Sequence, residues 1–300
     1  MVPMSPINLR WKASLSVSSL YAVLCSVEGH RSASNSLAEL LHEPSNTLVQ
    51  SIESSGLDVL SLLDSLVCLA AEYENNRQLV EVTLTRLYGR ETATPERLSI
   101  LSGAISGLIS RTMNQRPELI DELSLRAKPL QEQWESRGPG LMRTLAQLTE
   151  EGFVAEGGEV VLVTPFLGGN GRAFLRTNRV LIEAVLTNPH PNLPETLRLG
   201  WLLAQLQADT PSYAEGVTGD QLATLAQLAT IPAILAAAES VEWAACDLAT
   251  IEQALKCWYF QTDAPIELAE KLLHWWNTYN LGASSWHVAW RALDAVLQND

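Results

Sequence analysis

A glycine-rich segment followed by three arginines is the first place in the sequence where the residue types suggest chemistry. Successive backbone N–H groups in a glycine-rich turn can form a concavity that binds an anion, and guanidinium groups pair with phosphate or carboxylate. The candidate anion or ligand site comprises Gly169, Asn170, Gly171, Arg172, Arg176 and Arg179. The alternative is a hairpin turn followed by a polar strand face, because positions 172, 176 and 179 cannot all lie on one side of a strand.

Glu183 is the second candidate, because apolar residues surround it on both sides. A buried carboxylate either pairs with a cation or has its pKa raised by desolvation, and a raised pKa suits a general base at neutral pH. Asn178 and His190 lie in the same stretch, so we expect a candidate catalytic pocket of Glu183, His190 and Asn178 with the arginines. The alternatives are a structural ion pair with Arg179 or Arg198, or a carboxylate exposed on a sheet edge.

A third set of polar residues could ligate a metal. Glu267, Glu270 and His274 fall on one helical face, and His287 lies in the next predicted helix. Metal sites in helical bundles use Glu-x-x-His on two helices, whereas this chain has one glutamate–histidine spacing of four and no second copy. We therefore predict a solvated acidic face, no metal site and no cofactor. The usual local signatures of hydrolases, zinc proteases and nucleotide-binding loops are missing from the sequence.

Tryptophans gather near the C-terminus and offer a fourth candidate, an interaction surface. Large indole groups exposed on a surface often anchor a protein partner. The candidate interface residues are Trp275, Trp276, Trp286 and Trp290. Adjacent tryptophans point in different directions from a helix, so the four cannot all face one core from the same side. The alternative is that they close the core against neighbouring helices.

Composition limits the classes of partner. The chain has 300 residues, and its 34 acidic and 20 basic side chains give a formal net charge of -14. This charge has the wrong sign for a nucleic-acid backbone or an anionic membrane surface, so we expect neither as a partner. A hydrophobic fraction of 47% excludes a mainly disordered chain.

The cysteines and the longest uncharged segment bear on the cellular compartment. Cys25, Cys68, Cys246 and Cys257 are scattered through apolar sequence without a C-x-x-C pair, which is typical of free buried thiols in a reducing cytoplasm. Residues 221–238 carry no charge and nearly reach the length of a membrane span. Glutamines, threonines and a proline dilute this segment, so we predict a buried central helix, broken or kinked at Pro232.

Hydrophobic spacing predicts helices over most of the chain. Apolar residues repeat at three and four residues from 57 to 71, namely Leu57, Leu60, Leu63, Val67 and Ala71. Gly89 and Pro95 mark a stop and a new start. The segment 138–140, Gly-Pro-Gly, predicts a break between a helix that begins at Pro117 and extends toward Glu135 and a short helix that contains Leu141, Leu145 and Leu148. The remaining predicted helices cover residues 13–27, 96–112, 194–211, 220–240, 247–260, 264–278 and 285–298.

The periodicity changes between these helical regions. Residues 160–163 and 180–182 are β-branched or strand-tolerant, and Asn170-Gly171 between them is a dipeptide whose positive φ angles suit a tight turn. We therefore predict a β-hairpin at about 157–186.

The predicted fold is mainly α: a multi-helix globular bundle with one small β-hairpin inserted near the middle. Three regions are expected, namely helical 1–150, hairpin 151–190 and helical 191–300, and all three could form one domain. The first functional hypothesis is a soluble, cytoplasmic interaction or scaffold protein that binds a protein partner or itself. The alternative is a hydrolase-type enzyme whose polar pocket forms where the hairpin meets the helices.

Overall fold

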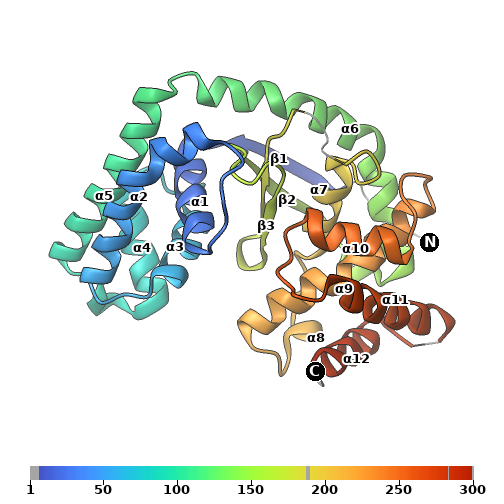
Figure 1. Cartoon of the computed structure of the whole chain (residues 1–300). Helices are drawn as coiled ribbons and strands as arrows, with labels where there is room; N and C mark the ends of the chain where they lie inside the picture. Colours follow the sequence, from blue (N-terminus) through green and yellow to red (C-terminus); the bar gives the residue numbers. More distant parts are fainter. Residues whose placement is uncertain (1–6, 187–189, 283, 299–300) are drawn as a thin grey trace.

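A small sheet lies between two groups of helices in the computed structural model, which describes residues 7–186, 190–282 and 284–298 (Figure 1). The fold is therefore mainly helical with a small sheet, as predicted. Within the described residues the helices are α1 (Leu15–Val27), α2 (Asn35–Ser54), α3 (Val59–Leu69), α4 (Asn76–Tyr88), α5 (Pro95–Gln115), α6 (Leu119–Leu148), α7 (Glu195–Ala204), α8 (Pro211–Ala214), α9 (Gly219–Glu239), α10 (Leu248–Cys257), α11 (Pro265–Leu281) and α12 (Trp286–Gln298). The strands are β1 (Asn8–Ala13), β2 (Gly157–Val163), β3 (Gly171–Phe174) and β4 (Arg179–Glu183).

The strand order is β1-β2-β4-β3, with β1, β2 and β4 parallel and β3 antiparallel to β4. A hairpin does lie inside 157–186, but its arms are β3 and β4 and its turn ends at Asn178, which has φ +50°. The predicted pairing of 160–163 with 180–182 across an Asn-Gly turn is wrong, because these strands run parallel. Gly168 and Gly169 use their positive φ angles to form a longer loop that leads from β2 to the outer strand β3.

The edge strand β1 precedes α1 and was not predicted. The helix expected at 13–27 is confirmed as α1, which begins where the Ser14 hydroxyl accepts a hydrogen bond from Val17 N. Within the six residues of β1, Leu9, Trp11 and Ala13 alternate with polar side chains and pack on one face of the sheet. This period of two is the strand signal, although it extends over only six residues.

The two faces of the sheet belong to two hydrophobic clusters. Val161 and Leu181 join the core formed with α1–α5, called here the N-terminal cluster. Val160 and Ile182, their neighbours along the same strands, join the core formed with α6–α12, called the C-terminal cluster. Alternating side chains of β2 and β4 therefore contribute to both cores. The division into three regions at 150 and 190 stays a prediction, and α6 belongs to the C-terminal cluster.

Helix α6 is continuous from Leu119 to Leu148, so the predicted helix end at 138–140 is wrong. Trp134, Leu141 and Met142 are buried in one cluster on both sides of Pro139, and this packing outweighs the hydrogen bond that proline removes. Gly138 has a specific packing reason, because a Cβ there would lie 2.4 Å from Trp134 Cδ2. The glycine leaves room for the indole ring against the helix backbone.

Helix α9 also continues through its proline, Pro232, without a break. By length and composition alone the segment Gln221–Glu239 could cross a membrane, yet 72% of its most apolar window is buried inside the protein. A buried central helix was the expectation for this segment. Its low amphipathicity follows from being surrounded, since α6, α7, α10, α11 and α12 all contact it.

Candidate functional site

The buried Glu183 carboxylate and the glycine loop form one structural unit. Five consecutive backbone N–H groups donate to it: Phe166 and Leu167 to Oε1 at 2.9 and 2.8 Å, and Gly168, Gly169 and Asn170 to Oε2 at 2.9, 2.6 and 3.1 Å. The loop thus binds an anion as its composition suggested, and the anion is a side chain of the same protein. With both oxygens saturated, Glu183 holds the loop in place.

The loop also connects the two groups of helices. The Tyr259 hydroxyl, beyond α10, donates to Leu167 O at 2.7 Å, and Ala33 N, before α2, donates to Phe166 O at 2.7 Å. Arg198 of α7 lies against the loop, since a Cβ on Gly169 would be 3.0 Å from its Nη1. Burial lowers the pKa of Arg198 to about 10, and the nearby Glu183 carboxylate acts in the opposite direction.

The structure does not bring the three candidate catalytic residues together. Asn178 and Glu183 lie at opposite ends of β4, about 16 Å apart at the rise of an extended strand. Asn178 is exposed and its amide donates to Gly157 O at 2.6 Å. His190 lies beside Gln253, with His190 Nδ1 3.5 Å from Gln253 Nε2. None of the three residues lines the α6–α7 region described below, and the contacts given for Asn178 and His190 are with Gly157 and Gln253.

Two of the three candidate arginines pair with different acidic groups, and neither pairs with Glu183. Arg172 pairs with Glu28 at 2.7 Å and with Asp64 at 2.9 Å, which ties β3 to α1 and α3. Arg179 pairs with Glu159 at 2.5 Å, whereas the alternative considered from the sequence was an ion pair between Arg179 and Glu183. Arg176 is exposed, and Gly171 begins β3. In the described structure these three arginines therefore do not gather around the glycine turn.

The four candidate interface tryptophans are buried in the C-terminal cluster. Trp275, Trp276, Trp286 and Trp290 expose 6%, 2%, 1% and 0% of their surface. Trp286 is central, with ring centroids 5.3 Å from Phe153 and 6.1 Å from Trp290. The alternative that they close the core is what the structure shows, and the expected aromatic interaction surface is wrong at these residues. Two adjacent helices, α11 and α12, surround one another's indoles, so the differing directions of the side chains do not require exposure.

The acidic face of α11 does not assemble a metal site. Glu267, Glu270, His274 and His287 are all exposed. No group of three or more potential metal-ligating side chains occurs among the residues that the structure describes.

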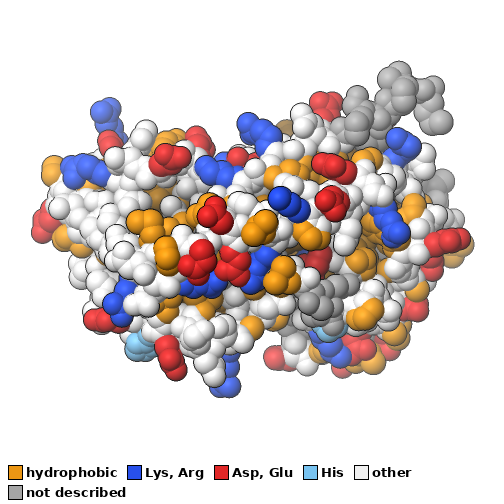
Figure 2. Space-filling model, turned by 90° about the horizontal axis from the view of Figure 1, so that it is seen from above, with side chains coloured by type: hydrophobic (Ala, Val, Ile, Leu, Met, Phe, Trp, Pro, Cys, Tyr) orange, Lys and Arg blue, Asp and Glu red, His pale blue; other side chains and the backbone are white. Residues whose placement is uncertain are grey.

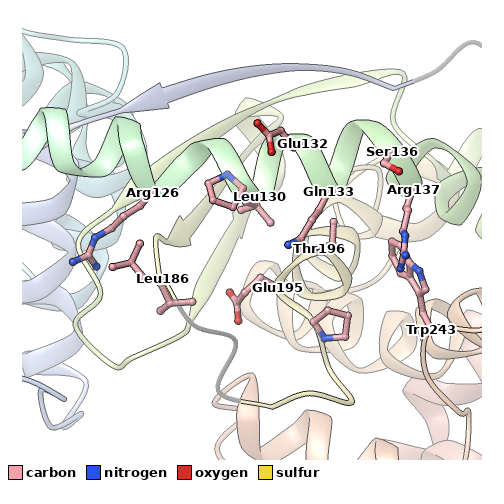
Figure 3. A pocket seen from close by; sticks show the side chains of 13 residues that line it. Arg126, Leu130, Glu132, Gln133, Ser136, Arg137, Leu186, Glu195, Thr196 and Trp243 are labelled. Carbon is pink, nitrogen blue, oxygen red and sulfur yellow. Dashed lines mark hydrogen bonds between the residues drawn. The ribbon is translucent and has the colours of Figure 1, made fainter.

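A cleft of about 610 Å³ lies between α6, the start of α7 and the residues that follow β4 (Figure 3). We call it the α6–α7 cleft. Its apolar side chains include Leu130, Val185, Leu186 and Trp243, and its polar ones include Arg126, Gln133, Arg137, Glu195 and Thr196. Figure 2 views the molecule from the side on which α6 lies, where basic, acidic and apolar side chains are interspersed.

One face of α6 forms the long wall of the cleft. Arg126, Leu130, Gln133 and Arg137 are spaced by four, three and four residues, which places them on one side of a helix over about 16 Å. Gln133 Oε1 accepts a hydrogen bond from the Thr196 hydroxyl at 3.1 Å, linking this wall to α7. At one end Arg126 pairs with Glu122 and donates to Ala184 O at 3.2 Å.

Arg137 marks the other end of the cleft. Its Cζ lies 5.4 Å from the centroid of the Trp243 ring, in a cation–π contact. Within the described part of the chain Arg137 forms no ion pair. Comparison with protein-family models, curated proteins and solved structures finds no match for the chain.

Sequence reasoning missed the cleft because it is formed by α6, by residues 185–186 and 194–196, and by Trp243, which are far from α6 in the chain. The helical spacing of 126, 130, 133 and 137 is a local signal and lies before the break expected at 138–140, but it does not show which other segments face this side of the helix. The junction of sheet and helices was the place expected for a pocket, and the cleft does lie beyond the end of β4. The residues that line it differ from those proposed.

Proposed function

We propose that the protein is a soluble, non-catalytic interaction protein that holds an acidic, extended segment of a protein partner in the α6–α7 cleft. The observation that carries the proposal is Arg137, a cation without an ion-pair partner in the described chain, held over Trp243 at one end of a partly apolar cleft. The hydrolase alternative gains no support from Glu183, because five N–H donors already occupy its carboxylate.

The dimensions of the cleft suit a short extended peptide. The wall from Arg126 to Arg137 is about 16 Å long, which equals about five residues of extended chain. Leu186 exposes 71% of its surface at the rim and Leu130 lies in the wall, so an apolar side chain can be buried between them. Leu130 and Arg137 are about 10 Å apart along the helix, so the preferred peptide carries an apolar and an acidic residue about three positions apart.

A carboxylate is the group that best complements the Arg137 end. Stacking on Trp243 orients the guanidinium, which then presents its N–H groups to an anion with less loss of side-chain freedom. Elsewhere the net charge of -14 repels an acidic segment, so this local cation specifies where such a segment docks. The same net charge disfavours nucleic acid as a partner, and the free thiols fit the cytoplasm.

A fixed-length library of fluorescein-labelled hexapeptides tests the proposal. One set pairs leucine with glutamate three positions later, and matched sets replace glutamate by glutamine or lysine. We expect the glutamate set to bind the native protein best by fluorescence anisotropy. Arg137→Gln should weaken that binding about tenfold, since hydrogen bonds between charged groups contribute about 1.5–3 kcal/mol.

Arg143→Gln is the matched control, because Arg143 is an exposed arginine on the same helix outside the cleft. It should leave the affinity within about twofold, as for a surface charge away from an interface. Equal losses in the two variants, or equal binding of the glutamate and glutamine sets, would show that Arg137 does not recognise a carboxylate.

A further inference from the structure

Glu195 occupies an unusual position in the wall of the cleft. It lines the cleft at the start of α7, and its carboxylate pairs with Nη2 of Arg198, one turn later on the same helix. Only 3% of the Arg198 side chain is exposed, against 14% of the Glu195 side chain. The acid thus separates the cleft from a deeply buried cation.

The guanidinium of Arg198 has unused capacity on the side that faces Glu195. Its Nε is buried and has no hydrogen-bond partner in the described chain. Nε and Nη2 form one edge of a guanidinium, and a carboxylate can accept from both at once. Glu195 engages only Nη2, so its carboxylate uses half of this edge.

The first turn of α7 adds a second feature that favours an anion. Pro194 is the N-cap residue and provides no side-chain cap for the first N–H groups of the helix. The positive end of the helix dipole therefore lies at the start of α7, where Glu195 lines the cleft. The buried Arg198 lies within this first turn, so both features act at one place.

We infer that Glu195 is an internal stand-in for the partner's carboxylate. When an acidic segment enters the cleft, its carboxylate replaces Glu195 on the Nε–Nη2 edge of Arg198, and Glu195 rotates out to water. The exchange is isoelectric at Arg198, so no buried charge is left without a partner at either stage. This inference rests on the proposed function, and it assigns a second anion subsite at the start of α7, beside Glu195 in the wall of the cleft.

The other side of Arg198 explains why the cation stays in place during this exchange. Nη1 lies against Gly169, in the loop that Glu183 holds through five N–H groups. A Cβ at position 169 would lie 3.0 Å from Nη1, which is closer than an ordinary van der Waals contact. The loop therefore contacts Arg198 on the Nη1 side, and the partner on the Nη2 side, Glu195, is the more exposed of the pair.

The test compares two variants that remove the same charge from the cleft. Glu195→Gln frees Arg198, whereas Glu132→Gln removes an acid that lines the cleft and forms no ion pair in the described chain. The probe is glutarate, with neutral glutaramide as its control. If Glu195 occupies Arg198 about nine-tenths of the time, Glu195→Gln should raise glutarate affinity about tenfold, and Glu132→Gln less than twofold.

The arginine Nε–H signal of Arg198 in a ¹⁵N NMR spectrum, assigned with Arg198→Lys, reports the site directly. It should shift on glutarate addition in Glu195→Gln and remain still with glutaramide. An unmoved signal, or equal affinity gains in Glu195→Gln and Glu132→Gln, would overturn the inference.

Glu195→Asp is the second variant, in case Glu195→Gln does not fold. It keeps the charge in the cleft but shortens the reach to Arg198 by one methylene, so it should also raise glutarate affinity above the native value. If library peptides bind through Arg137 while neither Glu195 variant changes glutarate binding, only this inference fails. If glutarate shifts the Arg198 signal in Glu195→Gln and no library peptide binds, the subsite stands and the proposed partner class fails.

Discussion

At the scale of single residues, Glu183 accounts for a loop that would otherwise be costly. Five successive N–H groups of a loop with two positive-φ glycines turn inward, and each would cost about 1–3 kcal/mol if buried without an acceptor. One carboxylate accepts from all five. The apolar surroundings of Glu183 made it a candidate in the sequence, but its partners are backbone groups whose positions depend on the loop, so residue types alone could not identify them.

We expect Glu183→Gln to lower the free energy of unfolding by about 3 kcal/mol or more, because an amide presents an NH₂ group to two or three of the five donors. Urea denaturation followed by circular dichroism measures the change. Glu156→Gln is the control, since Glu156 is exposed and lies near the start of β2. A loss in Glu183→Gln no larger than in the control would mean that the loop is held by other contacts.

Cys25 gives the chain a defined response to alkaline pH. Burial raises the pKa of this thiol to about 12, and the Glu183 and Glu28 carboxylates act in the same direction. The unfolded thiol loses its proton near pH 9, whereas the folded thiol keeps it. The stability that this thiol contributes to the folded protein is therefore fully present below pH 9 and falls as the pH rises toward 12. The contribution lost by pH 10.5 is about 2 kcal/mol.

Cys25→Ala removes this contribution. The free energy of unfolding should therefore fall less between pH 8 and pH 10.5 in Cys25→Ala than in the native protein, by about 2 kcal/mol. The comparison uses the change with pH in each protein, so the cavity left by the substitution cancels. Identical pH dependence in both proteins would contradict the assignment.

At the scale of elements, local sequence signals located most helices. They gave wrong boundaries where tertiary packing, rather than the neighbouring residues, determines whether a helix continues. The helix start at Pro95, with Thr94 as its N-cap, depends on neighbouring residues and was predictable. The continuity of α6 depends on Trp134 and Leu141 being buried in the same cluster, which Gly138 and Pro139 do not reveal. The predicted strand pairing was wrong for the same reason. A turn motif is a local signal, whereas the parallel pairing of β2 with β4 depends on the tertiary structure.

Two glycines in α6, only two residues apart, should respond oppositely to alanine. Gly138→Ala places a Cβ 2.4 Å from the Trp134 indole, and the resulting displacement should destabilise the protein by about 1–3 kcal/mol. Gly140→Ala meets no atom within 4 Å and should stabilise it by up to about 1 kcal/mol through helix propensity. Thermal denaturation distinguishes the two, and the same sign for both would mean that the indole moves aside freely.

At the scale of the whole molecule, the sheet makes each core depend on the other. β2 and β4 supply one set of side chains to the N-terminal cluster and the alternate set to the C-terminal cluster, so the loss of either cluster would expose an apolar sheet face. The mainly helical class followed from periodicity, which is local. The α6–α7 cleft and the shared sheet did not follow, since both join segments separated by many residues and several elements.

This dependence predicts a single unfolding transition, which is not the rule for a chain of 300 residues. All nine tryptophans contact the C-terminal cluster, so their fluorescence reports on that core alone. Val161→Ala alters only the N-terminal cluster and should cost about 2 kcal/mol, yet it should shift the fluorescence midpoint as much as the circular-dichroism midpoint. The matched control is Val160→Ala. It makes the same substitution on the opposite face of the same strand, where the side chain belongs to the C-terminal cluster. If Val161→Ala moves the dichroism midpoint and leaves the fluorescence midpoint in place, the two cores unfold independently and the sheet does not couple them.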